Sequence, residues 1–194
     1  MVRKKRKDKN SFFREAVSYL KATKKYIFLA IAVFVVSSFV GFGFSDKFGF
    51  FNEFLEELAL SIEGKNVFEL IWFIFTNNVS SAFFAMIFGA VFGIFPIINA
   101  ILNGTVLGYV FSLASAEGGF SVILYLVPHG IFELPAVFIS LGLGIRLGLF
   151  IFAKDKVKEL KYRFFSSIKV FLTIVLPLLI IAAIIEGIFI SITR

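Results

Sequence analysis

The sequence predicts an all-α membrane protein, a bundle of five transmembrane helices with shorter amphipathic helices at both membrane surfaces. Of the 194 residues, 59% are hydrophobic and 29 are phenylalanine, whereas an ordinary soluble domain is about 45–50% apolar. A disordered chain would be poor in aromatic residues. Basic and acidic residues also occupy separate segments between the apolar ones, which is typical of loops on opposite sides of a membrane.

The N-terminal segment is strongly basic, since ten of the 20 Lys and Arg residues lie within the first 25 positions. We expect residues 1–10 to be a disordered tail and residues 11–194 to form a single membrane domain. Residues 11–25 place their apolar side chains on one helical face and predict a helix on the membrane surface. Residues 26–45 are uncharged and long enough for the first span.

The middle of the chain predicts an acidic surface helix followed by two spans. Residues 47–63 combine glutamates with apolar residues at helical spacing, so we expect an amphipathic helix in the opposite interface. The apolar stretch after it is too long for one helix at about 1.5 Å per residue. Proline lacks an amide proton and disfavours helix in the residue before it. Pro96 therefore divides this stretch into spans at residues 68–94 and 96–115, joined by a tight turn.

The C-terminal third predicts two more spans around a basic segment. Residues 120–152 are too many for one straight span and contain Pro128 and Pro135. We expect this span to be broken or re-entrant, with its irregular backbone covered by protein or facing water. Residues 153–165 predict a basic amphipathic helix and residues 166–191 the last span, in which Glu186 near the outer end is expected to reach water.

Charge sets the predicted orientation in the cell membrane. Seventeen of the 20 basic residues lie in two regions, from Arg3 to Lys25 and from Arg146 to Lys169. The positive-inside rule places both regions in the cytoplasm, so an even number of spans separates them, and the last span after the second region makes the total odd. The N-terminus is then cytoplasmic, and the C-terminus and the acidic helix are extracytoplasmic. Anionic lipids of the cytoplasmic leaflet are expected partners of the basic segments.

The sequence lacks the motifs of the common enzyme classes. It contains no cysteine, which excludes disulfides and thiolate chemistry. His129 is the only histidine, and with Glu133 it provides too few ligands for a zinc site. The zinc-protease, nucleophile-elbow and nucleotide-binding motifs are absent. We therefore predict no enzymatic activity, no metal and no cofactor, and no nucleic-acid partner, because the basic tail lacks interleaved aromatic residues.

Polar residues inside the predicted spans are the candidates for a functional site. His129 and Glu133 are four residues apart and share a face of a helix that starts at Pro128, and ionisable residues in a membrane segment indicate function by default. A direct contact of Glu133 with Arg146, about 20 Å away along a straight helix, needs a bend. The predicted polar cluster consists of His129, Glu133, Arg146, Asn77, Asn78, Asn99 and Asn103. It either fixes a broken helix or lines a path for solutes or protons.

Three Gly-x-x-x-Gly patterns predict close helix packing. Small residues four apart let helix backbones approach in lipid. Packing within one chain is the favoured interpretation, and a dimer face is the alternative. The residues assigned to packing or hinges are Gly89, Gly93, Pro96, Gly104, Gly108, Pro128, Gly130, Pro135, Gly144 and Gly148.

Four sequence elements resemble the stage II sporulation protein M family over about residues 11–192. They are Asn77 with Asn78, the segment from Gly93-Ile-Phe-Pro96 to Asn103-Gly-Thr-Val-Leu-Gly108, Pro128-His-Gly-Ile-Phe-Glu-Leu-Pro135, and Gly142-Leu-Gly-Ile-Arg-Leu-Gly148. The founding member of this family anchors two peptidoglycan-degrading proteins. The resemblance therefore implies a multi-span helical protein that binds partners, without implying sporulation, because fold kinship does not transfer function.

Two functions from different classes fit these observations. The first is a non-enzymatic membrane scaffold or accessory subunit whose membrane or extracytoplasmic protein partner binds residues 47–63 or the basic segments. The second is a small-solute or proton-coupled transporter or channel that uses His129 and Glu133, with a homo-oligomer supplying the symmetry. An intramembrane hydrolase that uses the same two residues with water is a weaker third.

Overall fold

The computed structural model describes residues 9–117 and 121–193, with side chains for residues 11–116 and 130–193. All regular elements in these ranges are helices. Five of them are long and apolar enough to cross a membrane, which confirms the predicted fold class. Residues 1–8 of the predicted disordered tail lie outside the described residues, and the prediction is wrong for residues 9 and 10, which belong to the first helix.

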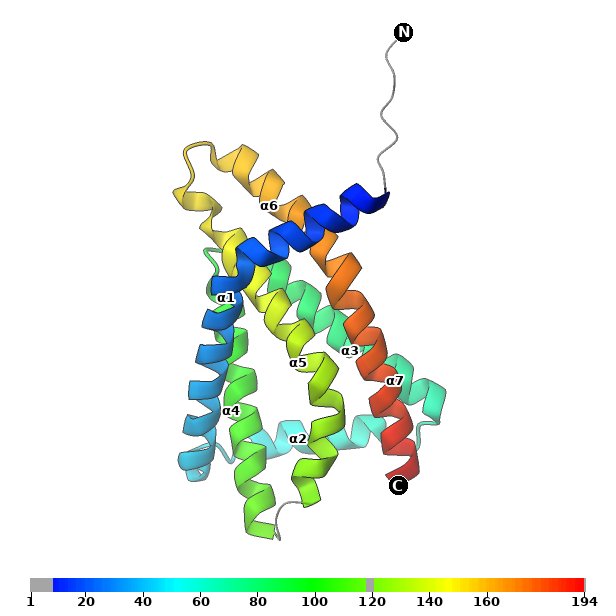
Figure 1. Cartoon of the computed structure of the whole chain (residues 1–194). Helices are drawn as coiled ribbons and strands as arrows, with labels where there is room; N and C mark the ends of the chain where they lie inside the picture. The colour runs from blue at the N-terminus through cyan, green and yellow to red at the C-terminus, as the bar shows by residue number, and fades with distance from the viewer. Residues whose placement is uncertain (1–8, 118–120, 194) are drawn as a thin grey trace.

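The first helix, α1 (Lys9–Gly43), joins the predicted surface helix and the first span into one element. No glycine or proline interrupts the sequence between Ser11 and Val40, so nothing in it breaks the helical hydrogen-bond ladder. Figure 1 shows that the first part of α1 lies across one end of the bundle, after which the helix bends and runs along it. The prediction of a surface segment followed by a span is thus realised within one helix.

The acidic segment crosses the opposite end of the bundle. A short 3₁₀ turn, η1 (Ser45–Lys47), leads to α2 (Phe51–Ile62), which lies across the bundle in Figure 1. Helix α3 (Val67–Ile87) begins at a capping box, in which the Asn66 side chain accepts from the Glu69 amide at 3.1 Å and Glu69 accepts from the Asn66 amide at 2.8 Å. Such reciprocal caps fix helix starts.

The turn between α3 and α4 lies before Pro96. Helix α3 ends in a 3₁₀ turn, η2 (Phe88–Ala90), and α4 runs over Ile94–Glu117. The chain reverses at Phe92 and Gly93, whose φ angles are 55° and 71°. Pro96 sits in the first turn of α4, where a missing amide proton costs little because those amides have no partner within the helix. The prediction that Pro96 marks the break is therefore wrong by three residues.

The fourth span is one continuous helix. Helix α5 (Ser121–Gly148) continues through Pro128 and Pro135 and ends in a 3₁₀ turn, η3 (Leu149–Phe152). The predicted break or re-entrant loop is therefore wrong. A proline inside a helix removes one hydrogen bond and kinks the helix, and neighbouring helices and side chains can satisfy the freed groups in a membrane bundle.

The last span and the basic helix before it also form one run of 38 residues from Lys156 to Thr193. A π-helical turn separates its two parts and ends two residues before Pro177. A wider turn is a common way to accommodate a proline, whose ring clashes with a carbonyl one turn earlier. The segments are α6 (Lys156–Val170), η4 (Phe171–Val175) and α7 (Leu176–Thr193).

Helix α5 is the centre of the bundle. It packs against α1, α3, α4 and α7, as Figure 1 shows. Half of the residues in its most apolar stretch are buried, compared with 22–33% in the other four spans. Leu141, Leu143 and Leu147 are fully buried there, so the core is organised around the second half of α5.

Glycines let the helix backbones touch within the chain. A Cβ at Gly104 or Gly108 would collide with the backbone of α1, and a Cβ at Gly89 with the backbone of Gly144. A Cβ at Gly148 would collide with the backbone of Gly93. All three Gly-x-x-x-Gly patterns therefore lie in contacts inside this chain.

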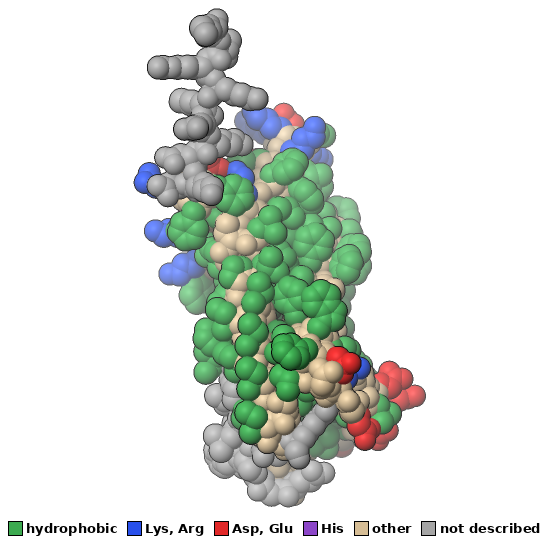
Figure 2. Space-filling model, turned by 90° about the vertical axis from the view of Figure 1, so that its right-hand side faces the viewer, with side chains coloured by type: hydrophobic (Ala, Val, Ile, Leu, Met, Phe, Trp, Pro, Cys, Tyr) green, Lys and Arg blue, Asp and Glu red, His purple; other side chains and the backbone are tan. Residues whose placement is uncertain are grey.

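Charge separates the two ends of the molecule. In Figure 2, Lys and Arg side chains gather at one end and acidic side chains at the other, with an apolar surface between. The acidic end includes the exposed Glu53, Glu56 and Glu57 of α2. We call the end formed by α6 and the first part of α1 the basic end, and the end at α2 the acidic end.

Candidate functional site

The predicted polar cluster divides into three places, of which the first two face one cavity. Glu133 meets Asn78 between α5 and α3, Asn99 and Asn103 pair on α4, and Arg146 lies at the basic end. The side chains of His129 and Pro128 lie outside the described residues, so the predicted pairing of His129 with Glu133 stays a prediction.

The first place is a carboxylate cluster at membrane depth between three helices. The Asn78 side chain lies within hydrogen-bonding reach of the Glu133 carboxylate, and the Asn77 amide reaches Asn78 Oδ1 at 3.4 Å. Glu186 on α7 lies close enough to Glu133 for the two charges to interact. Its Oε2 is buried and has no hydrogen-bond partner in the described part of the chain.

Glu186 is the member of this cluster that the sequence analysis missed. The expectation that it would reach water is wrong for Oε2, which is buried. The neighbouring Gly187 carries the missed signal, because a Cβ there would collide with Ile71 of α3. Small residues mark helix contacts in membranes, so Gly187 indicated that this face of α7 points into the bundle.

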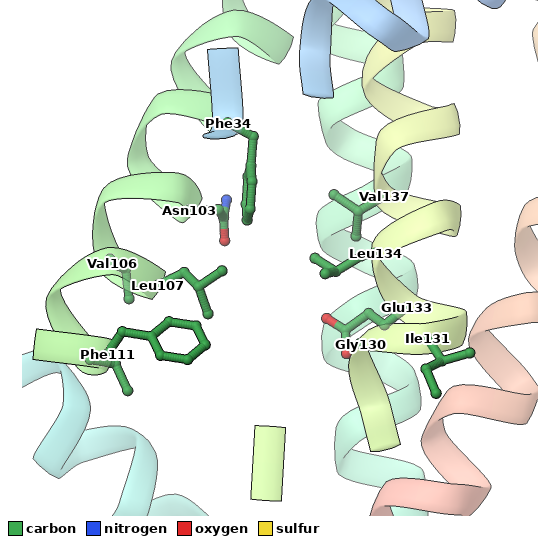
Figure 3. A pocket seen from close by; sticks show the side chains of 11 residues that line it. Phe34, Asn103, Val106, Leu107, Phe111, Gly130, Ile131, Glu133, Leu134 and Val137 are labelled. Atoms are coloured by element: carbon green, nitrogen blue, oxygen red, sulfur yellow. The ribbon is translucent and has the colours of Figure 1, made fainter. Parts of the chain in front are cut away.

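A cavity of about 470 Å³ lies beside this cluster, between α1, α4 and α5. Figure 3 shows Glu133 and Asn103 lining it from opposite walls, with the Glu133 carboxylate directed into the space. The Asn103 amide donates to Asn99 O at 2.9 Å and to Asn99 Oδ1 at 3.1 Å. Among the described residues that line the cavity, Glu133 and Asn103 carry the polar side chains. A mostly apolar cavity of this size with few polar groups is typical of small-ligand sites.

Aromatic packing bounds the cavity on the side of the basic end. The Phe34 and Phe138 rings meet edge to face with centroids 5.1 Å apart. Beyond them, Ile27 of α1 packs on Gly142 of α5 so closely that a Cβ there would collide. Helices α1 and α5 are therefore in close contact between the cavity and the basic end.

Arg146 ties α5 to α1 instead of meeting Glu133. Its Nη1 donates to Tyr19 O at 2.9 Å and to Thr23 Oγ1 at 2.9 Å. The guanidinium also lies over the Tyr19 ring, with Cζ 3.9 Å from the ring centroid. Cation–π contacts of this kind are strongest when partly desolvated, and Tyr19 is buried. The structure does not bring Arg146 and Glu133 together, because α5 continues as a helix between them.

A second arginine extends this contact to α6. Arg163 Nη1 donates to the Arg146 carbonyl at 2.6 Å, and its Nε pairs with Glu159 at 2.7 Å. The end of α5, the first part of α1 and α6 are thus connected through two arginine side chains and the backbone carbonyls of Tyr19 and Arg146. Among the described residues, no group of three His, Cys, Asp or Glu side chains lies close enough together to hold a metal ion.

The family model of stage II sporulation protein M matches residues 13–191. The uncharacterized protein MJ0706 of Methanocaldococcus jannaschii is 30% identical over 143 residues, which cover 71% of this chain and 63% of that protein. The chain thus spans less than two thirds of the length of this relative. No solved structure matches the chain.

Proposed function

Since the chain belongs to the stage II sporulation protein M family, we propose that it is a non-enzymatic membrane scaffold or accessory subunit that holds a partner protein at the membrane. The observation that carries this proposal is α2, a fixed helix that buries none of its twelve residues within the chain. A helix that contributes nothing to the core is available to contact the membrane surface and a partner.

Helix α2 is held in place through α4. Tyr109 Oη donates to Asn52 Oδ1 at 2.6 Å, and the Phe51 and Tyr109 rings lie 6.1 Å apart. Tyr109 itself is buried. The tether positions the glutamates of α2 at the acidic end, where a partner with a basic surface would find a preformed site, and preorganisation lowers the cost of binding.

The packing of the bundle also supports a fixed frame. Backbone contacts at glycines join α1 to α4, α5 to the turn after α3, and α7 to α3. Interfaces with direct backbone contact leave little room for one helix to slide on another, because any shift brings backbone atoms into collision. A rigid bundle suits a protein that positions others.

The test is co-purification from native membranes in mild detergent. We expect a stoichiometric second protein with the wild-type chain, and at least a tenfold loss of it when Glu53, Glu56 and Glu57 are all changed to Gln. The matched control neutralises three exposed lysines at the basic end, Lys154→Ala, Lys156→Ala and Lys158→Ala, and should retain the partner. Absence of any stoichiometric protein, or its retention by the glutamine variant, would contradict the assignment to α2.

The cavity favours a second candidate function, a proton-coupled or small-solute transporter. A carboxylate that faces a cavity at membrane depth is the kind of group used in proton relays. In proteoliposomes with a potassium gradient and a pH-sensitive dye, this function requires proton flux that Glu133→Gln abolishes. Glu63→Gln is the matched control, because Glu63 is exposed and does not line the cavity. Absence of flux with the wild-type protein would remove proton coupling.

A further inference from the structure

The basic end contains a second cleft, about 460 Å³ in volume, between the first part of α1, the end of α5 and α6. Figure 1 shows α6 and the first part of α1 crossing at this end. Three cationic side chains line the cleft, Arg146, Lys161 and Lys169, together with one carboxylate, Glu15. None of the functions proposed for the carboxylate cluster or for α2 uses this cleft.

The cleft carries an excess of positive charge. Lys169 pairs with Glu15, which also accepts a hydrogen bond from Ser11 at 2.9 Å. Lys161 has no ion pair among the described residues. Three cations and one carboxylate leave a formal charge of +2 in a partly enclosed space, and a concave surface of one charge sign attracts the opposite ion.

Arg146 is oriented in advance for an anion. A guanidinium has five N–H donors, and the bonds of Arg146 to described residues leave from Nη1 alone. The Tyr19 ring holds the guanidinium plane in place, and Tyr162 packs edge to face on Tyr19 with centroids 5.9 Å apart. A fixed guanidinium with unused donors matches the geometry of a phosphate group.

The surroundings of the cleft select a lipid rather than a soluble anion. Phe165 lines the cleft and is 63% exposed. Phe12 is 41% exposed, and its ring lies 5.6 Å from Lys169 Nζ. Exposed aromatic rings next to basic groups are typical of a protein surface at the level of lipid headgroups. A phosphate with an acyl chain would satisfy both the charges and the rings.

We propose that this cleft binds the phosphate headgroup of an anionic phospholipid, with Arg146, Lys161 and Lys169 as its ligands. The site is on the same side of the molecule as both basic segments, so its lipid belongs to the leaflet that those segments contact. This proposal does not depend on which function the carboxylate cluster or α2 serves.

Titration of the purified full chain in nanodiscs tests the site. The probe is phosphatidylglycerol diluted into phosphatidylcholine, and retained lipid is counted by native mass spectrometry. We expect one tightly retained phosphatidylglycerol, and Lys161→Ala should weaken its retention about fivefold, the effect of one basic contact at a lipid surface. Lys161→Arg should restore it. Lys158→Ala is the matched control, since Lys158 is exposed on the same helix and does not line the cleft.

Two outcomes would overturn the proposal. Equal losses for Lys161→Ala and Lys158→Ala would mean that diffuse surface charge, and not this cleft, attracts the lipid. Displacement of the retained phosphatidylglycerol by millimolar inorganic phosphate would mean that the cleft serves a soluble phosphate compound. Lys161 is exposed, so its replacement leaves the core intact and either result concerns binding alone.

Discussion

The two halves of α5 have opposite characters. From Ser140 to Gly148 every residue except Arg146 is buried, and glycines there touch neighbouring backbones. From Gly130 to Val137, one side of the helix lines a cavity and carries the Glu133 carboxylate. We call them the packed half and the cavity half. The difference indicates that one half holds the fold together while the other keeps a space that stability alone does not require.

The largest expected effect is in the packed half. A Cβ at Gly144 would lie 2.6 Å from Pro96 Cγ and 2.8 Å from Ala85 O, and the backbone oxygen cannot turn away as a side chain would. We expect Gly144→Ala to destabilise the protein by about 3 kcal/mol or to prevent folding. The measurement is the yield of monodisperse protein and its thermal unfolding in detergent. An unchanged unfolding temperature would contradict the close backbone contact.

The next largest effect concerns the contact of Arg146 with Tyr19 and Thr23, at the end of the packed half. Arg146→Met removes two hydrogen bonds and the stacking on Tyr19 while keeping an unbranched side chain. We expect a loss of about 2 kcal/mol, with faster hydrogen exchange in the first part of α1. Arg14→Met, at an exposed arginine of α1, should change neither quantity. A similar loss in both variants would mean that general charge, and not this contact, stabilises α1.

The cavity half should respond weakly to loss of its charge. Glu133→Gln keeps the shape of the side chain and its reach to Asn78, and it removes a carboxylate from an apolar setting. We therefore expect stability to stay equal or to rise by up to about 1 kcal/mol, as measured by thermal unfolding in detergent. A loss of stability of more than about 1 kcal/mol in the Glu133→Gln variant would show that the charged carboxylate itself stabilises the fold. That result would weaken the transport candidate.

The smallest expected effect is that of Gly130→Ala, which makes in the cavity half the same glycine-to-alanine change that Gly144→Ala makes in the packed half. A Cβ at Gly130 would meet the Leu134 side chain at 3.5 Å, an ordinary contact. Gly130→Ala should stabilise the helix by about 0.5 kcal/mol, since alanine restricts the unfolded chain. Opposite signs for Gly130→Ala and Gly144→Ala in the same unfolding assay would establish the division of α5, and equal losses would reject it.

The sequence was sufficient to predict the spans, because apolar length and charge distribution are properties of each segment alone. Proline breaks were predicted less well. Pro96 lies in a first helical turn that does not need its amide proton, and Pro128 and Pro135 lie within a helix that continues through them. A proline costs one hydrogen bond, and tertiary packing decides whether that cost ends the helix.

The candidate site was predicted only in part, because tertiary packing decides which side chains meet. Glu133, Asn103 and Asn78 are polar residues in apolar spans, so the sequence identifies them without help. The partner of Arg146 is Tyr19, 127 positions away in the chain, and no local pattern connects the two. The inward direction of Glu186 depends on the rotation of α7 in the bundle, which hydropathy does not reveal.

The π-helical turn Phe171–Val175 determines which side of the last helix faces the bundle. One extra residue in a turn rotates everything after it by about 100° relative to a regular α-helix. The turn therefore separates the register of α6, which presents Lys161 and Lys169 to the basic cleft, from that of α7, which presents Gly187 to α3 and Glu186 to Glu133 of α5. Without the inserted residue, a regular α-helix could not present Lys161 and Lys169 to the cleft and Glu186 to its present neighbour at the same time. The Glu186 side chain would then point in a direction about 100° away.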